Sequence, residues 1–152
     1  MKPRFNHILL LLCFGLLLVT MYSITHSFPA KRGGLYLIWA EQVANNSFLY
    51  PKDTIGYTYR NIPFAYPPVG IYLMAVPNAL GVPSLLVARI MPGVIYVISI
   101  IALYIFVTEY YDSSLYGLLA GIFALACPQI LSQTIVGAGV TRSLGILFVS
   151  VG

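Results

Sequence analysis

Long apolar runs alternate with short polar breaks along this chain, and one polar segment, residues 31–68, is longer than the others. The apolar runs are built from leucine, isoleucine, valine, small and aromatic residues with almost no charge. Helices of about 20 apolar residues cross the hydrocarbon core of a bilayer. We therefore predict an all-α integral membrane protein, a multi-span helical bundle whose spans cover residues 8–26, 67–80, 85–108, 115–131 and 143–152.

The first apolar run follows a short basic start, which is also how a secretory signal peptide begins. Lys2 and Arg4 precede residues 8–24. A signal peptide has an apolar core of about 7–15 residues and ends in small residues, whereas this run is longer and leads into His26 and Pro29. We predict an uncleaved first span.

The second apolar run is short, and whether it crosses the membrane decides where the charges lie. Pro67-Pro68 suits the first turn of a helix, but residues 69–80 are too few to span unless Pro77 only kinks the helix or the bilayer is thin. If the run crosses, Arg89 and Arg142 lie with the N-terminus, and the eight lysines and arginines divide equally between the two sides. If it does not, six of the eight lie on the side of the long loop, which favours a cytoplasmic loop. We expect the crossing version, with the N-terminus in the cytoplasm and the loop outside.

The final apolar run, residues 144–151, stops after about two turns. A helix of that length cannot cross a bilayer. We therefore expect that the sequence continues past Gly152, and that residues 1–152 form a single incomplete transmembrane domain.

Composition agrees with a membrane class and excludes others. Hydrophobic residues make up 59% of the chain, charged residues make up 8%, and the mean hydropathy is +0.88, whereas a soluble domain carries about 25% charged residues. The net charge of +4 is spread too thinly for a nucleic-acid surface, and it suits contact with anionic or phosphate-bearing lipid. Cys13 and Cys127 lie in apolar runs without metal-ligand spacing. We expect them to pack as small hydrophobic residues, and we expect no metal and no cofactor.

The long polar segment begins with a predicted interfacial helix in the first external loop. In residues 34–46, Glu41, Gln42 and Asn45 fall on one narrow helical face and most other positions are apolar. A short helix of this kind lies in the membrane interface. The Asn and Ser that follow compete with helical hydrogen bonding, so the helix is expected to end there. The tyrosines of the remaining loop, within residues 27–66, are expected to sit near the headgroups.

Glu41 is the first candidate for a catalytic base, because it projects from the polar face of the interfacial helix. A carboxylate there can take a proton from an acceptor hydroxyl. The alternative is a solvated residue that only orients the helix. Asp53 is the second candidate, but beside Lys52 in a proline-bounded turn it also suits the role of a turn former.

Four cations are candidate ligands for a lipid phosphate. Lys31, Arg32 and Arg60 lie in the loop, where cations neutralise a phosphate and stabilise it as a leaving group; ordinary headgroup contact is the alternative. Arg142 follows two glycines and leads into a helix, so it can meet a phosphate together with backbone N–H groups. The alternative for Arg142 is an arginine that caps a span at the cytoplasmic interface.

The predicted span 115–131 carries small residues at helical spacing. Gly117-x-x-x-Gly121 and Ala120-x-x-x-Ala124 place them on one side, which lets another helix approach closely. A chance match in a span rich in glycine and alanine is the alternative.

A series of residues matches, in chain order, those of a known class of membrane proteins. The series is Tyr36, Trp39-Ala40, Pro67-Pro68, Gly81, Arg89 and Pro92, followed by the stretch 137–143. With the external loop between the first two spans, this order resembles the N-terminal part of multi-pass membrane glycosyltransferases of the GT-C class, which includes protein mannosyltransferases and aminoarabinose transferases. The resemblance covers residues 8–143.

The resemblance implies transfer of a sugar from a polyprenyl-phosphate donor to an acceptor at the outer face of the cell membrane, with an acid of the first external loop as base. The class usually has that acid a few positions before the tyrosine, where this chain has Lys31-Arg32-Gly33-Gly34. Catalysis by this chain therefore stays open, and the fragment alone is not expected to be active. The expected partners are the lipid bilayer and the polyprenyl-phosphate-sugar donor.

The alternative is a non-enzymatic multi-pass membrane protein, either an assembly subunit or a small transporter. A transporter usually needs an ionisable group deep in the membrane. The predicted spans carry none at their centres, since Glu109 and Asp112 fall in a turn. This weighs against transport and leaves a structural role as the alternative.

Overall fold

The computed structural model describes residues 3–25, 33–52, 68–128 and 139–151. Every regular element in those ranges is a helix, which confirms the all-α prediction. The helices are α1 (Phe5–Thr25), α2 (Gly33–Asn45), α3 (Pro68–Ala79), α4 (Ser84–Tyr110), α5 (Ser114–Ala126) and α7 (Gly139–Val151). Of these, α1 and α4 are long and apolar enough to cross a membrane, and α5 is a shorter apolar helix.

α5 ends earlier than the apolar run that predicted it. Its last residue is Ala126, and Cys127 has extended dihedral angles (φ −75°, ψ 105°). Pro128 follows, and a proline disfavours the helical conformation of the residue before it. The first helix of the predicted span 115–131 therefore ends at Ala126, before this proline.

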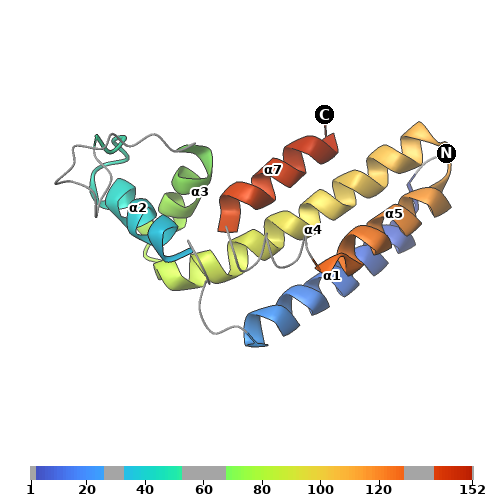
Figure 1. The fold of residues 1–152 in the computed structure, drawn as a ribbon, viewed down its shortest axis with the longest axis horizontal. Coiled ribbons are helices and arrows are strands. Elements are labelled where there is room, and N and C mark those ends of the chain that lie inside the picture. Colours follow the sequence, from blue (N-terminus) through green and yellow to red (C-terminus); the bar gives the residue numbers. More distant parts are fainter. Residues whose placement is uncertain (1–2, 26–32, 53–67, 129–138, 152) are drawn as a thin grey trace.

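α1 and α4 run antiparallel, and polar contacts link them at both ends (Figure 1). At one end, the backbone N–H of Arg4 donates to the hydroxyl of Tyr104 at 2.9 Å. At the other, Nε of Arg89 donates to the carbonyl oxygen of Ser23 at 3.1 Å. The start of α1 thus lies beside the end of α4, and the end of α1 lies beside the start of α4.

Glycines let the backbones of α1 and α4 approach closely along their length. A Cβ atom added to Gly93 would lie 2.3 Å from Cγ1 of Val19, and one added to Gly15 would lie 3.0 Å from Cγ2 of Val97. Both distances are shorter than ordinary van der Waals contact, so each helix offers a glycine to a valine of the other. Small residues at such a crossing allow close helix packing.

The glycines of α5 serve the same purpose, which confirms the close helix approach predicted from their spacing. A Cβ on Gly117 would lie 2.2 Å from Oγ1 of Thr108 on α4, and one on Gly121 would lie 2.9 Å from Leu11 on α1. The two glycines therefore face two different helices. Tyr96 of α4 also donates its hydroxyl hydrogen to the carbonyl oxygen of Ala124 at 2.9 Å. α1, α4 and α5 form one packed layer around a core of Leu11, Val19, Tyr96, Val97, Ile100, Tyr104 and Leu125.

A second core joins α2, α3 and α7 to the first half of α4. α2 packs against α3, and α7 lies alongside α4 (Figure 1). We call α2, α3 and the residues between α2 and Lys52 the cap, because in Figure 1 they lie at one end of α4. The buried side chains of this core include Tyr36, Trp39, Ala40, Val43, Ile71, Met74, Ala75, Val87, Val140 and Leu144.

The structure corrects the expected position of Arg89. Arg89 was predicted to lie with the N-terminus, on the assumption that the helix from residue 67 carries the chain across the bundle. Instead, Arg89 contacts Ser23 at the far end of α1. The reason is the length of α3, whose 12 residues extend about 18 Å and pack against α2, α4 and α7. The end of α1 and the start of α4 therefore lie at the same end of the bundle, with α3 between them in the chain.

The α1–α4 contact predicts the effect of a single methyl group. Gly93→Ala should lower the free energy of unfolding by about 1–3 kcal/mol, because the new Cβ overlaps Val19. Gly145→Ala on α7, where an added Cβ has nothing within 4 Å, should be neutral or stabilising by up to about 1 kcal/mol. Unfolding in detergent micelles measures both. When Gly93→Ala is combined with Val19→Ala, the loss of stability should be smaller than the sum of the two single losses. Equal stability of Gly93→Ala and Gly145→Ala would contradict the contact.

Candidate functional site

Glu41 lies on the outer face of the cap. It is exposed on α2, as are Ile38 and Asn45, whereas Ala40 and Val43 are buried against the cap core. The buried side chains hold α2 in place by packing on α3 and α4. Within α2, the rings of Tyr36 and Trp39 make a T-shaped contact with centroids 5.6 Å apart. The carboxylate of Glu41 is therefore accessible from solvent and is carried by a helix that is fixed on its opposite side.

Gln42 does not share the exposed face on which it was predicted. Its Oε1 atom is buried and accepts no hydrogen bond from the residues that the structure describes. Because successive residues on a helix differ in direction by about 100°, Glu41 and Gln42 diverge, and only Glu41 reaches the outside. On α3, both polar atoms of the Asn78 side chain are also buried without a hydrogen-bond partner among the described residues. The cap thus contains buried amide atoms, Oε1 of Gln42 and both polar atoms of Asn78, that have no hydrogen-bond partner among the described residues.

α2 ends in a tight turn that is attached to α3 within the cap. The N–H of Phe48 donates to the carbonyl oxygen of Val43 at 3.0 Å, and both Ser47 (φ 52°) and Phe48 (φ 61°) have left-handed backbone angles. Such angles are uncommon for residues other than glycine. The carbonyl oxygen of Phe48 accepts a hydrogen bond of 3.0 Å from the hydroxyl of Tyr72 on α3. The end of α2 predicted near its asparagines is therefore confirmed, and its geometry is fixed by a residue of the next helix.

Arg89 is a cation that sequence reasoning did not place among the candidate residues. It is half-buried, and both Nε and Nη2 donate to the same carbonyl oxygen of Ser23. Ser23 belongs to the last turn of α1, where carbonyl groups have no partner within their own helix. The signal available in the sequence was an arginine near the start of a long apolar run, but its partner is 66 residues away.

The structure describes only part of the predicted site. Asp53, Lys31, Arg32 and Arg60 lie outside the described residues. Arg142 falls in the first turn of α7, whose beginning packs into the same core as α2, through Val140 and Leu144; the side chain of Arg142 is outside the description. Glu41 and the helix that carries Arg142 are therefore brought to one end of the bundle.

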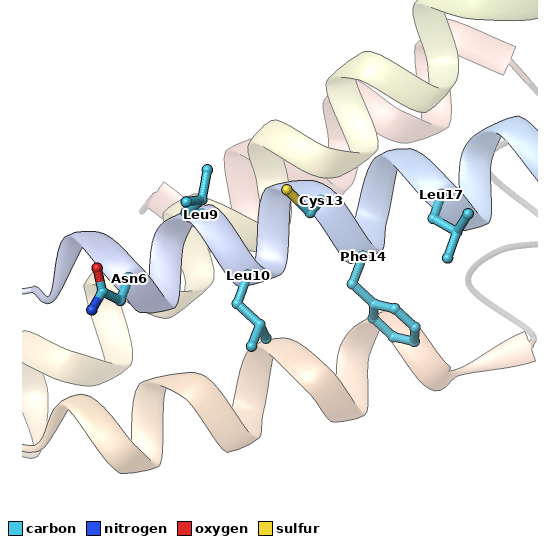
Figure 2. A pocket seen from close by; sticks show the side chains of 6 residues that line it. All are labelled: Asn6, Leu9, Leu10, Cys13, Phe14 and Leu17. Carbon is cyan, nitrogen blue, oxygen red and sulfur yellow. The ribbon is translucent and has the colours of Figure 1, made fainter.

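Two pockets lined by described residues are mostly apolar and carry little that could take part in acid–base chemistry. One is lined by α1 residues on its outer face, Asn6, Leu9, Leu10, Cys13, Phe14 and Leu17 (Figure 2). Cys13 was expected to pack as a small hydrophobic residue, but it is exposed on this face, because the packed face of α1 runs through Leu11, Gly15 and Val19. A second pocket lies between the end of α3 and the first half of α4, and all its lining residues are apolar: Pro77, Val82, Leu86, Val87, Ile90, Met91 and Val94.

The described residues form no metal site, and comparison with known proteins identifies no relative. Among the described residues, no group of three His, Cys, Asp or Glu side chains is placed to hold a metal ion. Comparisons with known protein families, with characterised proteins and with solved structures found no match to this chain. What can be said of function therefore rests on the cap, on the apolar surfaces and on Glu41.

The Arg89–Ser23 contact predicts that replacing Arg89 destabilises the protein more than replacing Lys52, another cation at the same end of the bundle. Arg89→Met should lower the free energy of unfolding by about 1–2 kcal/mol, since it removes two charge-assisted hydrogen bonds and leaves the Ser23 carbonyl without them. Lys52→Met, at an exposed position of the cap, should stay within about 0.5 kcal/mol of the unsubstituted protein. Denaturant unfolding in micelles measures the difference. An unchanged stability of Arg89→Met would show that this link is not needed.

Proposed function

We propose that the chain is part of a membrane-bound glycosyltransferase that transfers a sugar from a polyprenyl-phosphate donor to an acceptor at the membrane surface. The observation that supports it best is the position of Glu41. It is an exposed carboxylate on a fixed helix, at the end of a pair of helices that are long and apolar enough to cross a bilayer. This is the geometry expected of a base that meets a lipid-linked donor at the headgroup level.

The apolar surface supports a location within the cell membrane. Large hydrophobic side chains are exposed along α1, α4 and α5, among them Leu17, Ile98 and Phe123. Contiguous apolar surface of this extent is unfavourable in water and is stabilised by hydrocarbon. We propose a multi-pass arrangement in which α1 and α4 cross the bilayer in opposite directions, with α5 and α7 beside α4.

The antiparallel pair implies that the cap lies on one side of the membrane. The chain leaves α1 and enters α4 at the same end, so in this proposal α3 does not cross. Lys31, Arg32, Arg60 and Arg142 are proposed to neutralise the donor phosphate on that side. We place the cap on the outer face, as the resemblance implies. The positive-inside rule favours the opposite orientation, because six of the eight lysines and arginines then share the side of the cap.

In the proposed reaction, the Glu41 carboxylate accepts the proton of an acceptor hydroxyl. The hydroxyl oxygen forms a bond to the anomeric carbon of the sugar while the bond from that carbon to the phosphate oxygen breaks. Polyprenyl phosphate leaves with the bonding electrons, and nearby cations stabilise its negative charge. The buried Oε1 atom of Gln42 and the buried amide of Asn78 are additional hydrogen-bonding groups in the cap.

A structural subunit is the second candidate function. The two described pockets are lined almost entirely by apolar side chains, and neither contains an acid or a base of useful strength. Such surfaces suit contact with lipid or with another membrane helix more than they suit catalysis. In that case Glu41 would only orient α2 at the interface.

The proposal predicts that Glu41→Gln abolishes sugar transfer from a polyprenyl-phosphate sugar in membranes that contain the full protein, because the amide cannot accept the proton. Transfer of radiolabelled sugar to acceptor measures the effect. Glu109→Gln is the matched control, since Glu109 is an exposed glutamate at the other end of α4. Unchanged transfer by Glu41→Gln would remove Glu41 from the mechanism and favour the structural subunit.

The proposed topology predicts which positions share a side of the membrane. In a background with Cys13→Ser and Cys127→Ser, single cysteines replace Lys52, Leu80 and Glu109, all of which are exposed. A membrane-impermeant maleimide applied to sealed vesicles should label Lys52→Cys and Leu80→Cys from one side, and Glu109→Cys from the other. Labelling of Lys52→Cys from the side of Glu109→Cys, with Leu80→Cys labelled from the opposite side, would show that α3 crosses. The side on which Lys52→Cys reacts in intact cells decides the orientation of the cap.

A further inference from the structure

The turn between α4 and α5 carries a continuous group of aromatic rings. The rings of Phe106 and Tyr110 stack with centroids 6.0 Å apart, those of Tyr110 and Tyr111 meet edge to face at 4.9 Å, and those of Tyr111 and Tyr116 meet at 6.0 Å with an interplanar angle of 90°. We call these four residues the aromatic ladder. It lies at the end of α4 opposite to the cap (Figure 1).

The ladder is exposed, although its members are among the largest side chains of the protein. Phe106 is 49% exposed, Tyr110 72%, Tyr111 60% and Tyr116 55%. The rings therefore stabilise one another without being buried under any described part of the chain. Because successive tyrosine rings stand at 75° and 90° to each other, they present faces in more than one direction.

Two acidic residues lie beside the rings. Glu109 and Asp112 flank Tyr110 and Tyr111 in the sequence, and both are exposed. No lysine or arginine occurs from residue 90 to residue 141. The nearest described cation at this end is Arg4, an exposed residue whose backbone N–H is bonded to the hydroxyl of Tyr104. The turn is thus acidic and aromatic, with a cation at the start of the neighbouring helix.

We propose that the aromatic ladder, with Glu109 and Asp112, binds the ammonium group of zwitterionic lipid headgroups. Aromatic faces attract ammonium cations, and quaternary ammonium ligands are bound by groups of such rings. Tyrosine is also enriched where an apolar span meets the headgroups, and the ladder stands where the apolar helix α4 ends. The two carboxylates favour the ammonium of choline or ethanolamine and disfavour an anionic headgroup. Arg4 is the cation at this end that suits the phosphate of the same zwitterion.

The inference rests on the part of the proposed function that places α4 across a membrane. It does not depend on sugar transfer or on Glu41, which lies at the other end of α4. It also assigns different lipid contacts to the two ends: phosphate-bearing lipid near the cap, and ammonium-bearing headgroups at the ladder.

The test compares lipids that remain bound to the full protein. The protein is reconstituted in vesicles of equal parts phosphatidylcholine, phosphatidylethanolamine and phosphatidylglycerol, extracted in mild detergent, and the lipids retained per chain are counted by native mass spectrometry. The unsubstituted protein should retain either or both of the ammonium-bearing lipids over phosphatidylglycerol by about fivefold. The combined variant Tyr110→Leu, Tyr111→Leu and Tyr116→Leu should lose that preference.

Three further variants separate the ring faces from size and hydroxyl groups. The combined Tyr→Phe variant at the same positions should keep the preference, since the ring faces remain. Glu109→Gln should reduce it, and Phe123→Leu on α5, which removes an equally exposed ring away from the turn, should leave it unchanged. The fluorescence of Trp39, the single tryptophan and a buried residue of the cap, reports that each variant is folded.

Equal retention of all three lipids by the unsubstituted protein, or an unchanged preference in the leucine variant, would overturn the proposal and leave the ladder as a general interfacial belt. Resistance to alkaline carbonate extraction, measured on the same membranes, separates failure of the lipid proposal from failure of the membrane part of the proposed function. A chain that carbonate releases does not span, which overturns the membrane part of the proposed function and this proposal with it. A chain that resists extraction but shows no headgroup preference refutes the lipid proposal alone.

Discussion

The close contact of α1 with α4 is the constraint on which the rest of the structure depends. It requires Gly93 to face Val19 and Gly15 to face Val97, so the two helices have one relative direction and one register. Once they are antiparallel in this register, the segment that joins them has to begin and end at one end of the pair. The cap, with α2 and α3, is the consequence of that requirement. Glu41 therefore owes its position to glycines on other helices.

Much of the helical content could be predicted from the sequence, because long apolar runs and helical periodicity are local properties. α1 and α4 follow from their runs, the glycines of α5 follow from their spacing, and the end of α2 follows from residues that compete with helical hydrogen bonds. The position of α3 could not be predicted in this way. A short apolar helix with a proline fits a kinked span and a helix packed at one end equally well. The contact between Arg89 and Ser23, which places the start of α4 beside the end of α1, joins residues 66 positions apart and leaves no local signal in the sequence.

In the candidate site too, local properties could be predicted from the sequence and long-range packing could not. The exposure of Glu41 could be predicted from the polar face of its helix, but the burial of the Oε1 atom of Gln42 could not, because tertiary packing decides which side of a narrow polar face is covered. Cys13 is the reverse case: it lies in an apolar run but is exposed, because α1 is apolar on its outer side as well as on its packed side. Sequence hydrophobicity therefore predicts the apolar helix without telling its inner face from its outer one.

Arg89 shows how the antiparallel arrangement gives a charge a favourable partner. A cation in the first half of a helix gains no stabilisation from the dipole of its own helix, whose negative end is at the other terminus. In this fold the guanidinium of Arg89 reaches the last turn of α1, where the dipole of the neighbouring helix is negative and a carbonyl group needs a partner. With α1 parallel to α4, the same arginine would meet a second positive helix end. The charge therefore favours the direction of packing that the glycines allow, and both together hold the cap at one end of the bundle.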